Sequence, residues 1–78
     1  MTDPSAPSEN DARMARLAHD LRTPLAIIAG FTELLMTREE SLSAEQRRDY
    51  IERVRAAGEE MRVMLDDERA ERLAREGA

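Results

Sequence analysis

Apolar side chains recur every three or four residues in two long stretches, and this spacing constrains the fold more than any other feature. In the first stretch the apolar positions are Met14, Leu17, Leu21, Pro24, Leu25, Ile28, Phe31 and Leu35. In the second they are Tyr50, Ile51, Val54, Ala57, Met61, Met64 and Leu65. Residues three and four apart share one face of an α-helix, so each stretch predicts an amphipathic helix.

Polar residues indicate where the first helix begins. Residues 1–10 contain two prolines and two serines and little that is apolar, so we expect a disordered lead-in. Asn10 and Asp11 are both residue types that cap helix N-termini. The first helix is therefore expected over about residues 11–36.

A short polar segment at about residues 37–43 is the expected connection. Ser43, followed three residues later by Gln46, matches a capping box, which predicts a second helix over about residues 44–75. The apolar spacing fails after Leu65, so the last turns are expected to be helical but poorly packed.

Two long helices joined by a short loop predict an all-α fold, an antiparallel helical hairpin over residues 11–76. With 78 residues and no cysteine, a single hairpin has neither a large core nor disulfides to stabilise it. We expect two hairpins to bury their apolar faces together as a homodimeric four-helix bundle. The alternative is a hairpin that packs on a different protein.

Composition excludes several kinds of function. A net charge of −5 argues against a nucleic-acid interface. No apolar run approaches the roughly 20 residues that span a bilayer, and no signal peptide is evident, so a cytoplasmic protein without a membrane partner is expected. One histidine and no cysteine make a metal site unexpected.

The only histidine opens the run HDLRTPL, His19 to Leu25. The apolar spacing places His19 on the outer face of its helix, with Thr23 one turn later. A neutral imidazole is a good nucleophile, and the neighbouring Asp20 is a candidate proton acceptor. Pro24 removes a helical hydrogen bond to the Asp20 carbonyl, so a bend is expected there. A histidine in a structural core would interrupt the apolar stripe, whereas this one does not.

This run resembles the phosphoacceptor motif of the dimerisation and histidine-phosphotransfer domain of two-component sensor histidine kinases. The resemblance continues through Ile28, Gly30 and the triplet Glu33-Leu34-Leu35, and along the second helix from Arg53 to Leu65. It covers about residues 11–67, which is most of the expected helical domain.

The resemblance implies a role for each residue of the motif. His19 becomes the phosphorylated nucleophile, and Asp20 becomes its acid/base partner. Thr23 matches the position that helps hydrolyse a partner's aspartyl phosphate, and Pro24 matches the helix bend. The resemblance also implies transfer of the phosphoryl group to an aspartate on a response-regulator receiver domain.

Two departures from that family limit what the chain is expected to do alone. It contains no Gly-rich phosphate loop and no Mg²⁺-binding Asn segment, so we expect no cofactor on this chain and expect ATP and Mg²⁺ on a separate kinase subunit. Residues 66–72 are charged, apart from Ala70, where the family is apolar, which is expected to weaken the bundle end nearest the start of the first helix.

Three interpretations remain open. The first is a phosphoacceptor that receives its phosphoryl group from a separate ATP-binding histidine-kinase subunit, so that the chain supplies half of a protein-histidine kinase and is not an ATP-binding enzyme on its own. The second is a non-catalytic helical module that dimerises with, or sequesters, a histidine kinase. The third is a fragment of a larger sensor kinase.

Overall fold

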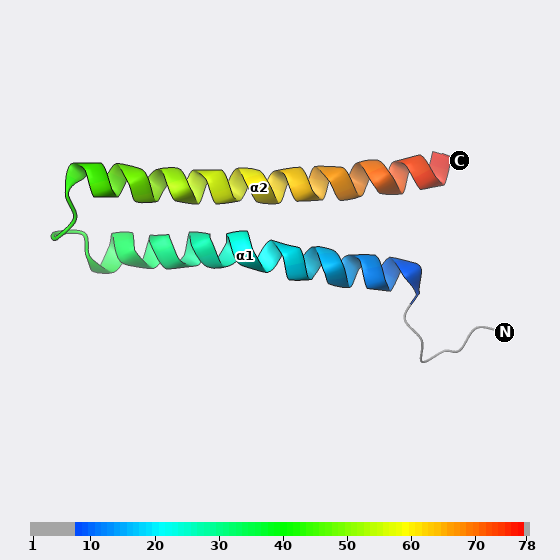
Figure 1. Ribbon diagram of the computed structural model, residues 1–78, viewed down its shortest axis with the longest axis horizontal. Helices are drawn as coiled ribbons and strands as arrows, with labels where there is room; N and C mark the ends of the chain where they lie inside the picture. The colour runs from blue at the N-terminus through cyan, green and yellow to red at the C-terminus, as the bar shows by residue number, and fades with distance from the viewer. Residues whose placement is uncertain (1–7, 78) are drawn as a thin grey trace.

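A computed structural model of the chain describes residues 8–77, which form two long helices. Helix α1 spans Glu9–Thr37 and helix α2 spans Ala44–Gly77. The helices lie side by side and run in opposite directions, with the connection at one end and the described termini at the other (Figure 1). The predicted all-α hairpin is confirmed, whereas its dimerisation into a bundle stays a prediction.

The start of α1 differs from the sequence-based expectation. Ser8 is the N-cap, because its Oγ accepts a hydrogen bond from the Asp11 N–H at 3.1 Å and the Asp11 carboxylate accepts one from the Ser8 N–H at 3.4 Å. Asp11 therefore closes a capping box instead of capping the helix itself, and the expectation of a cap at Asn10 or Asp11 was wrong. Residues 9 and 10 belong to the helix, and residues 1–7 of the expected lead-in lie outside the described residues.

The start of α2 confirms the predicted capping box. The Ser43 N–H donates to the Gln46 side chain at 2.9 Å, and the Gln46 N–H donates to Ser43 Oγ at 3.0 Å. The Arg47 guanidinium donates to the Glu39 carbonyl at 3.2 Å, which ties the connection to the first turn of α2. The helix continues to Gly77, two residues beyond the expected end.

The apolar layer between the helices is thin. Pro24 and Ala57, one on each helix, are the only fully buried residues among those described. Near the connection the rings of Phe31 and Tyr50 pack with centroids 5.0 Å apart, and the Arg53 guanidinium lies 5.6 Å from the centre of the Phe31 ring. These contacts join the two helices between the buried pair and the connection.

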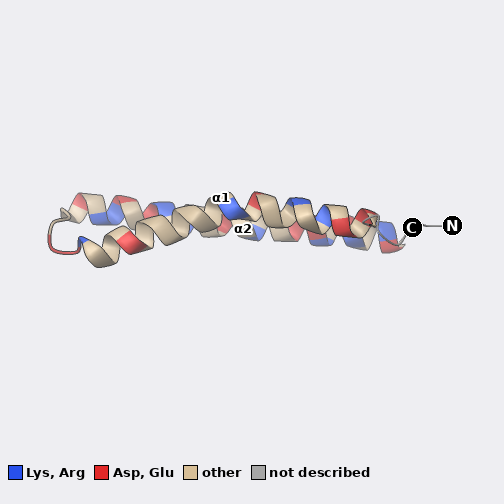
Figure 2. Ribbon diagram, turned by 90° about the horizontal axis from the view of Figure 1, so that it is seen from below, with Lys and Arg blue, Asp and Glu red and all other residues tan. Residues whose placement is uncertain are grey.

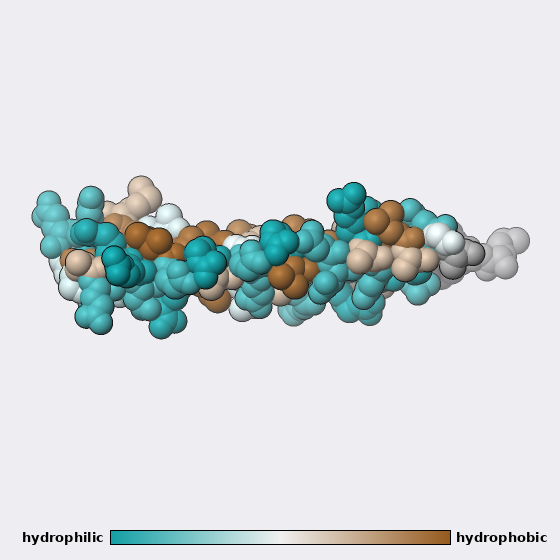
Figure 3. Space-filling model, turned by 90° about the horizontal axis from the view of Figure 1, so that it is seen from above, coloured by the Kyte–Doolittle hydropathy of each residue, from teal (hydrophilic) through white to brown (hydrophobic). Residues whose placement is uncertain are grey.

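Part of the predicted apolar stripe stays exposed. We define the apolar side face by its four large residues: Met14, Leu25, Ile51 and Leu65, which are 53, 53, 53 and 49 % exposed. Each of the four follows an inward-facing residue in the sequence. It is therefore turned about 100° away from the layer between the helices. Seen from the α2 side, the surface of the hairpin is mainly hydrophilic and carries separate hydrophobic patches (Figure 3). One hairpin therefore cannot cover all the apolar surface that the sequence provides.

The open end of the hairpin, opposite the connection, is held together by charge. Along α1, charged residues gather in the half that leads to this end (Figure 2). Arg13 contacts the carboxylates of Glu68, at 3.4 Å, and Glu71, and the Arg13 and Glu68 side chains are only 13 % and 18 % exposed. The charged segment of residues 66–72 thus contacts α1 through the ion pairs of Glu68 and Glu71 with Arg13.

Two further observations concern the described residues. Neither helix has an apolar stretch of the length and hydropathy that a bilayer crossing requires. Within residues 8–77, no three potential ligand side chains come together as a candidate metal site.

We predict that Arg13→Ala lowers the free energy of unfolding by about 1–2 kcal/mol, because two carboxylates lose their shared cation at a partly buried position. The measurement is thermal unfolding followed by circular dichroism at a fixed protein concentration. Arg55→Ala is the control, since Arg55 pairs with Glu52 on the exposed surface of a single helix and its loss is expected to change stability much less. Equal effects of the two substitutions would contradict a role for Arg13 in joining the helices.

Candidate functional site

His19 lies on the exposed surface of α1, away from the layer that faces α2. Its position follows from the spacing of the buried rows, because Leu17, Leu21 and Pro24 take the inward positions and leave His19 outside. Nothing in the described part of the chain covers the imidazole, so a partner protein can reach it.

Asp20 and Thr23 both follow His19 on α1, but they differ in how far they turn toward α2. Asp20 lines an open polar groove between the helices, together with Arg16 and Asp67, so its side chain is directed further toward α2 than the imidazole. Thr23 is exposed one turn after His19 on the same surface. The structure therefore groups His19 and Thr23 on the outer surface and places Asp20 at the rim of a groove.

Pro24 is both a buried residue and a break in the hydrogen bonding of α1. It is the most deeply buried side chain of the hairpin, with less than 2 % exposure. Because proline has no N–H, the Asp20 carbonyl lacks its normal helical donor. The two halves of α1 are not collinear, and the change of direction lies in the middle of the helix, in its cyan segment (Figure 1). The predicted hinge is thus packed into the interhelical layer as well.

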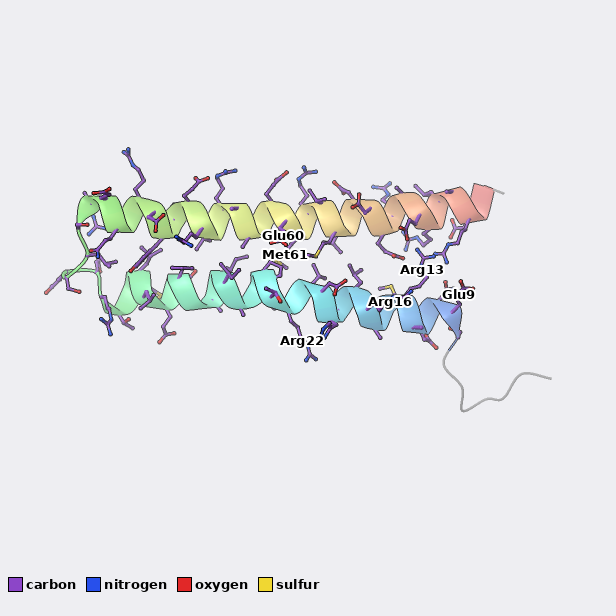
Figure 4. The ribbon with its side chains drawn as sticks, viewed as in Figure 1. Glu9, Arg13, Arg16, Arg22, Glu60 and Met61 are labelled. Atoms are coloured by element: carbon purple, nitrogen blue, oxygen red, sulfur yellow. The ribbon has the colours of Figure 1, made fainter. Side chains whose placement is uncertain are left out.

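An apolar groove begins two turns after His19, on the side of α1 where Thr23 lies. We call it the side groove, and define it by Ala26, Ile27, Gly30, Phe31 and Leu34 of α1 with Arg53, Ala56 and Glu60 of α2. Figure 4 shows Glu60 pointing from α2 toward α1 and Arg22 projecting away from α2. The sequence analysis missed this groove, because part of it forms between the two helices and the apolar stripe alone does not show it.

Gly30 lies in the side groove, and Gly58 lies between Ile51 and Leu65 at seven-residue spacing. A Cβ atom added at either glycine would have no neighbour within 4 Å. Neither glycine is therefore needed for close packing inside the hairpin, and both leave open space on its surface.

Comparison with known proteins shows the family to which the chain belongs. The family model for the His Kinase A (phospho-acceptor) domain matches residues 10–74. The chain is 32 % identical over 63 residues to the cell-division control histidine kinase PdhS of Brucella anthropi. That alignment covers 80 % of this chain but only 6 % of the relative, so the chain spans a small part of that kinase. No solved structure matches the chain.

We predict that Pro24→Ala raises the free energy of unfolding by about 1 kcal/mol, although it removes buried volume. Restoring the helical hydrogen bond and relieving the steric clash is worth about 3 kcal/mol, and losing the buried ring costs about 2 kcal/mol. Chemical denaturation measures the stability, and hydrogen exchange checks whether the new amide at position 24 is protected.

Pro24→Gly tests the backbone contribution to this prediction. It also restores the N–H, but glycine is a poor helix former. It is expected to be less stable than Pro24→Ala. A Pro24→Ala protein less stable than the parent would show that ring packing outweighs the backbone defect.

Proposed function

This chain belongs to the His Kinase A (phospho-acceptor) domain family of two-component signalling, and we propose that His19 accepts a phosphoryl group from a separate ATP-binding kinase subunit and passes it to a receiver-domain aspartate. The observation that carries this proposal is an uncovered imidazole on the outer surface of α1, beside a hydroxyl and a carboxylate. The proposal includes a cytoplasmic location, where ATP is present.

The proposed chemistry proceeds in two transfers. In the first, a nitrogen of the neutral His19 imidazole attacks the γ-phosphorus of ATP on the kinase subunit, and the P–O bond to ADP breaks. The other ring nitrogen then gives up its proton, for which Asp20 is the acceptor. In the second, the receiver aspartate attacks the same phosphorus, the P–N bond breaks and the imidazole regains a proton. Thr23 is proposed to position water when the receiver's aspartyl phosphate is hydrolysed.

The side groove is the proposed docking site for the receiver domain. It is apolar along Ala26, Ile27 and Gly30, and Arg53 and Glu60 at its α2 edge supply one charge of each sign. It begins next to the surface that carries His19 and Thr23, so a domain seated there can bring its aspartate to the phosphorylated ring. The open space at Gly30 allows a partner's backbone or side chain to approach α1 closely.

A second copy of the chain is the proposed occupant of the apolar side face. With only Pro24 and Ala57 fully buried among the described residues, one hairpin has little core to stabilise it. Pairing two hairpins through Met14, Leu25, Ile51 and Leu65 would complete a four-helix bundle. Gly58 lies within this face and leaves room for a side chain of the second copy.

We predict that His19→Gln abolishes phosphorylation of the chain, since glutamine keeps a polar side chain of similar reach but no nucleophilic ring nitrogen. The chain is incubated with radiolabelled ATP and each separate histidine-kinase subunit encoded in the source genome, and then chased with receiver domains. Asp20→Asn is expected to slow labelling at least tenfold. Thr23→Ala is expected to keep labelling but to leave the receiver's aspartyl phosphate longer-lived.

Labelling that persists in His19→Gln would overturn the proposed acceptor. If His19→Gln leaves both binding to a kinase and signalling output unchanged, the chain acts instead as a non-catalytic module that sequesters the kinase.

We predict that Ile51→Glu converts the chain from a dimer to a monomer, because it places a charge within the apolar side face. Light scattering after size-exclusion chromatography measures the molar mass. Val63→Glu is the matched control, since Val63 is 44 % exposed on the opposite side of α2 and its replacement is expected to leave the dimer intact. Identical masses for the two variants would exclude this face as the dimer interface.

A further inference from the structure

A pattern of charges repeats every seven residues along α2. In each repeat an acidic residue is followed three residues later by an arginine, and we call the row of these residues the charged seam: Glu45 and Arg48, Glu52 and Arg55, Glu59 and Arg62, Asp66 and Arg69. Their spacing alternates between three and four residues, so all of them fall on one side of the helix. Arg48 and Asp66 lie about two and a half turns from the buried Ala57, so this side is opposite α1.

The charged seam is exposed along its whole length. Figure 4 shows side chains with nitrogen and oxygen atoms along the side of α2 that faces away from α1. Glu52 forms an ion pair with Arg55. Arg62 forms ion pairs with Glu59 and Asp66. Hydrogen bonds from the arginines lower the pKa of Glu52 and of Glu59, so both carboxylates stay ionised at neutral pH. Exposed ion pairs contribute little to stability, so these side chains can change partners at small cost.

The order of charges in the seam is complementary to itself when it is read backwards. Residues equally far before and after position 57 carry opposite charges: Glu45 and Arg69, Arg48 and Asp66, Glu52 and Arg62, Arg55 and Glu59. An antiparallel second copy, related by a twofold axis at residue 57, therefore places every carboxylate opposite a guanidinium. A parallel copy in register would place like charges opposite each other, which is unfavourable.

We propose that the charged seam is a binding surface for the seam of a second copy of this chain, aligned antiparallel. The seam holds as many acidic as basic residues, so the contact itself is neutral although the chain has a net charge of −5. Ile51 and Leu65 of the apolar side face are turned by about 100° from the layer between the helices, whereas the seam is centred opposite that layer. Pairing through the seam therefore joins chains that the apolar side face does not join.

The seam contact is expected to be weak and reversible. Each exposed ion pair contributes little, so the contact depends on all the pairs of the seam forming together. It should weaken further in about 1 M salt, which screens exposed charges. It does not require His19 to be phosphorylated.

Charge exchange at the centre of the seam tests the proposal. The acidic variant carries Arg55→Glu and Arg62→Glu, and the basic variant carries Glu52→Arg and Glu59→Arg. In either variant alone, like charges face each other across the contact, whereas a mixture of the two brings opposite charges together. Sedimentation velocity at high protein concentration measures association of the full chain and of each variant, alone and mixed, and circular dichroism checks that each is helical.

The parent chain is expected to form assemblies larger than those of the apolar side face. Each variant alone should associate at least about fivefold more weakly, and an equimolar mixture should recover the association of the parent. The control carries Arg38→Glu and Arg75→Glu, two exposed positions outside the seam that give the same net charge as the acidic variant. It is expected to associate as the parent does.

Crosslinking tests the antiparallel register. Ala44 and Ala70 are exposed at the two ends of the seam and are equally far from residue 57, so Ala44 of one copy lies beside Ala70 of the other. The chain has no cysteine, so Ala44→Cys and Ala70→Cys variants can be mixed and joined by a short bismaleimide. The mixed product should exceed each symmetrical product several-fold, because two Ala44 positions are about 39 Å apart in this arrangement.

Three results would overturn the proposal. The first is a parent chain that forms no assembly through the seam, so that it and both charge variants have the same mass. The second is a mixture of the variants that recovers no association. The third is a mixed crosslink only about twice as abundant as each symmetrical one, which is the ratio that random collision between exposed thiols gives.

Discussion

The rest of this structure depends on the limited ability of two helices to bury an apolar stripe. A helix pair has only one shared layer, and here that layer fully encloses just Pro24 and Ala57 among the described residues. The same layer fixes which side chains point outward, and His19 is one of them. The packing that holds the helices together thus also exposes the imidazole, and it leaves part of the apolar surface uncovered.

Pro24 combines a buried packing position with a break in the hydrogen bonding of α1. As a helix breaker it leaves the Asp20 carbonyl without its usual donor, directly beside the imidazole. As a buried ring it anchors the weakened turn against α2. The bend is therefore held at a fixed place in the hairpin, so the loosened backbone next to His19 does not require a loosely packed core.

Local sequence patterns predicted most of the fold and the position of His19 on it. The Ser43 and Gln46 capping box and the outward position of His19 follow from spacings of three or four residues, which one helix determines by itself. The start of α1 was misplaced because Asp11 serves equally well as a cap or as the third residue of a helix capped by Ser8. The side groove and the contacts of Arg13 join residues of two helices, and the stripe alone does not show which of its members one hairpin leaves exposed.

The contacts of Arg13 imply that the hairpin is not uniformly stiff along its length. Glu68 and Glu71 are one turn apart on α2, about 4.5 Å along the axis, and both already lie against the same guanidinium. If the ends of the helices shift along each other, the Arg13 guanidinium can exchange one carboxylate for the other and still form an ion pair. The tilted ring pair of Phe31 and Tyr50, nearer the connection, offers no such alternative partner. Axial strain applied to the hairpin should therefore be absorbed at the charged end, close to His19, while the connection stays fixed.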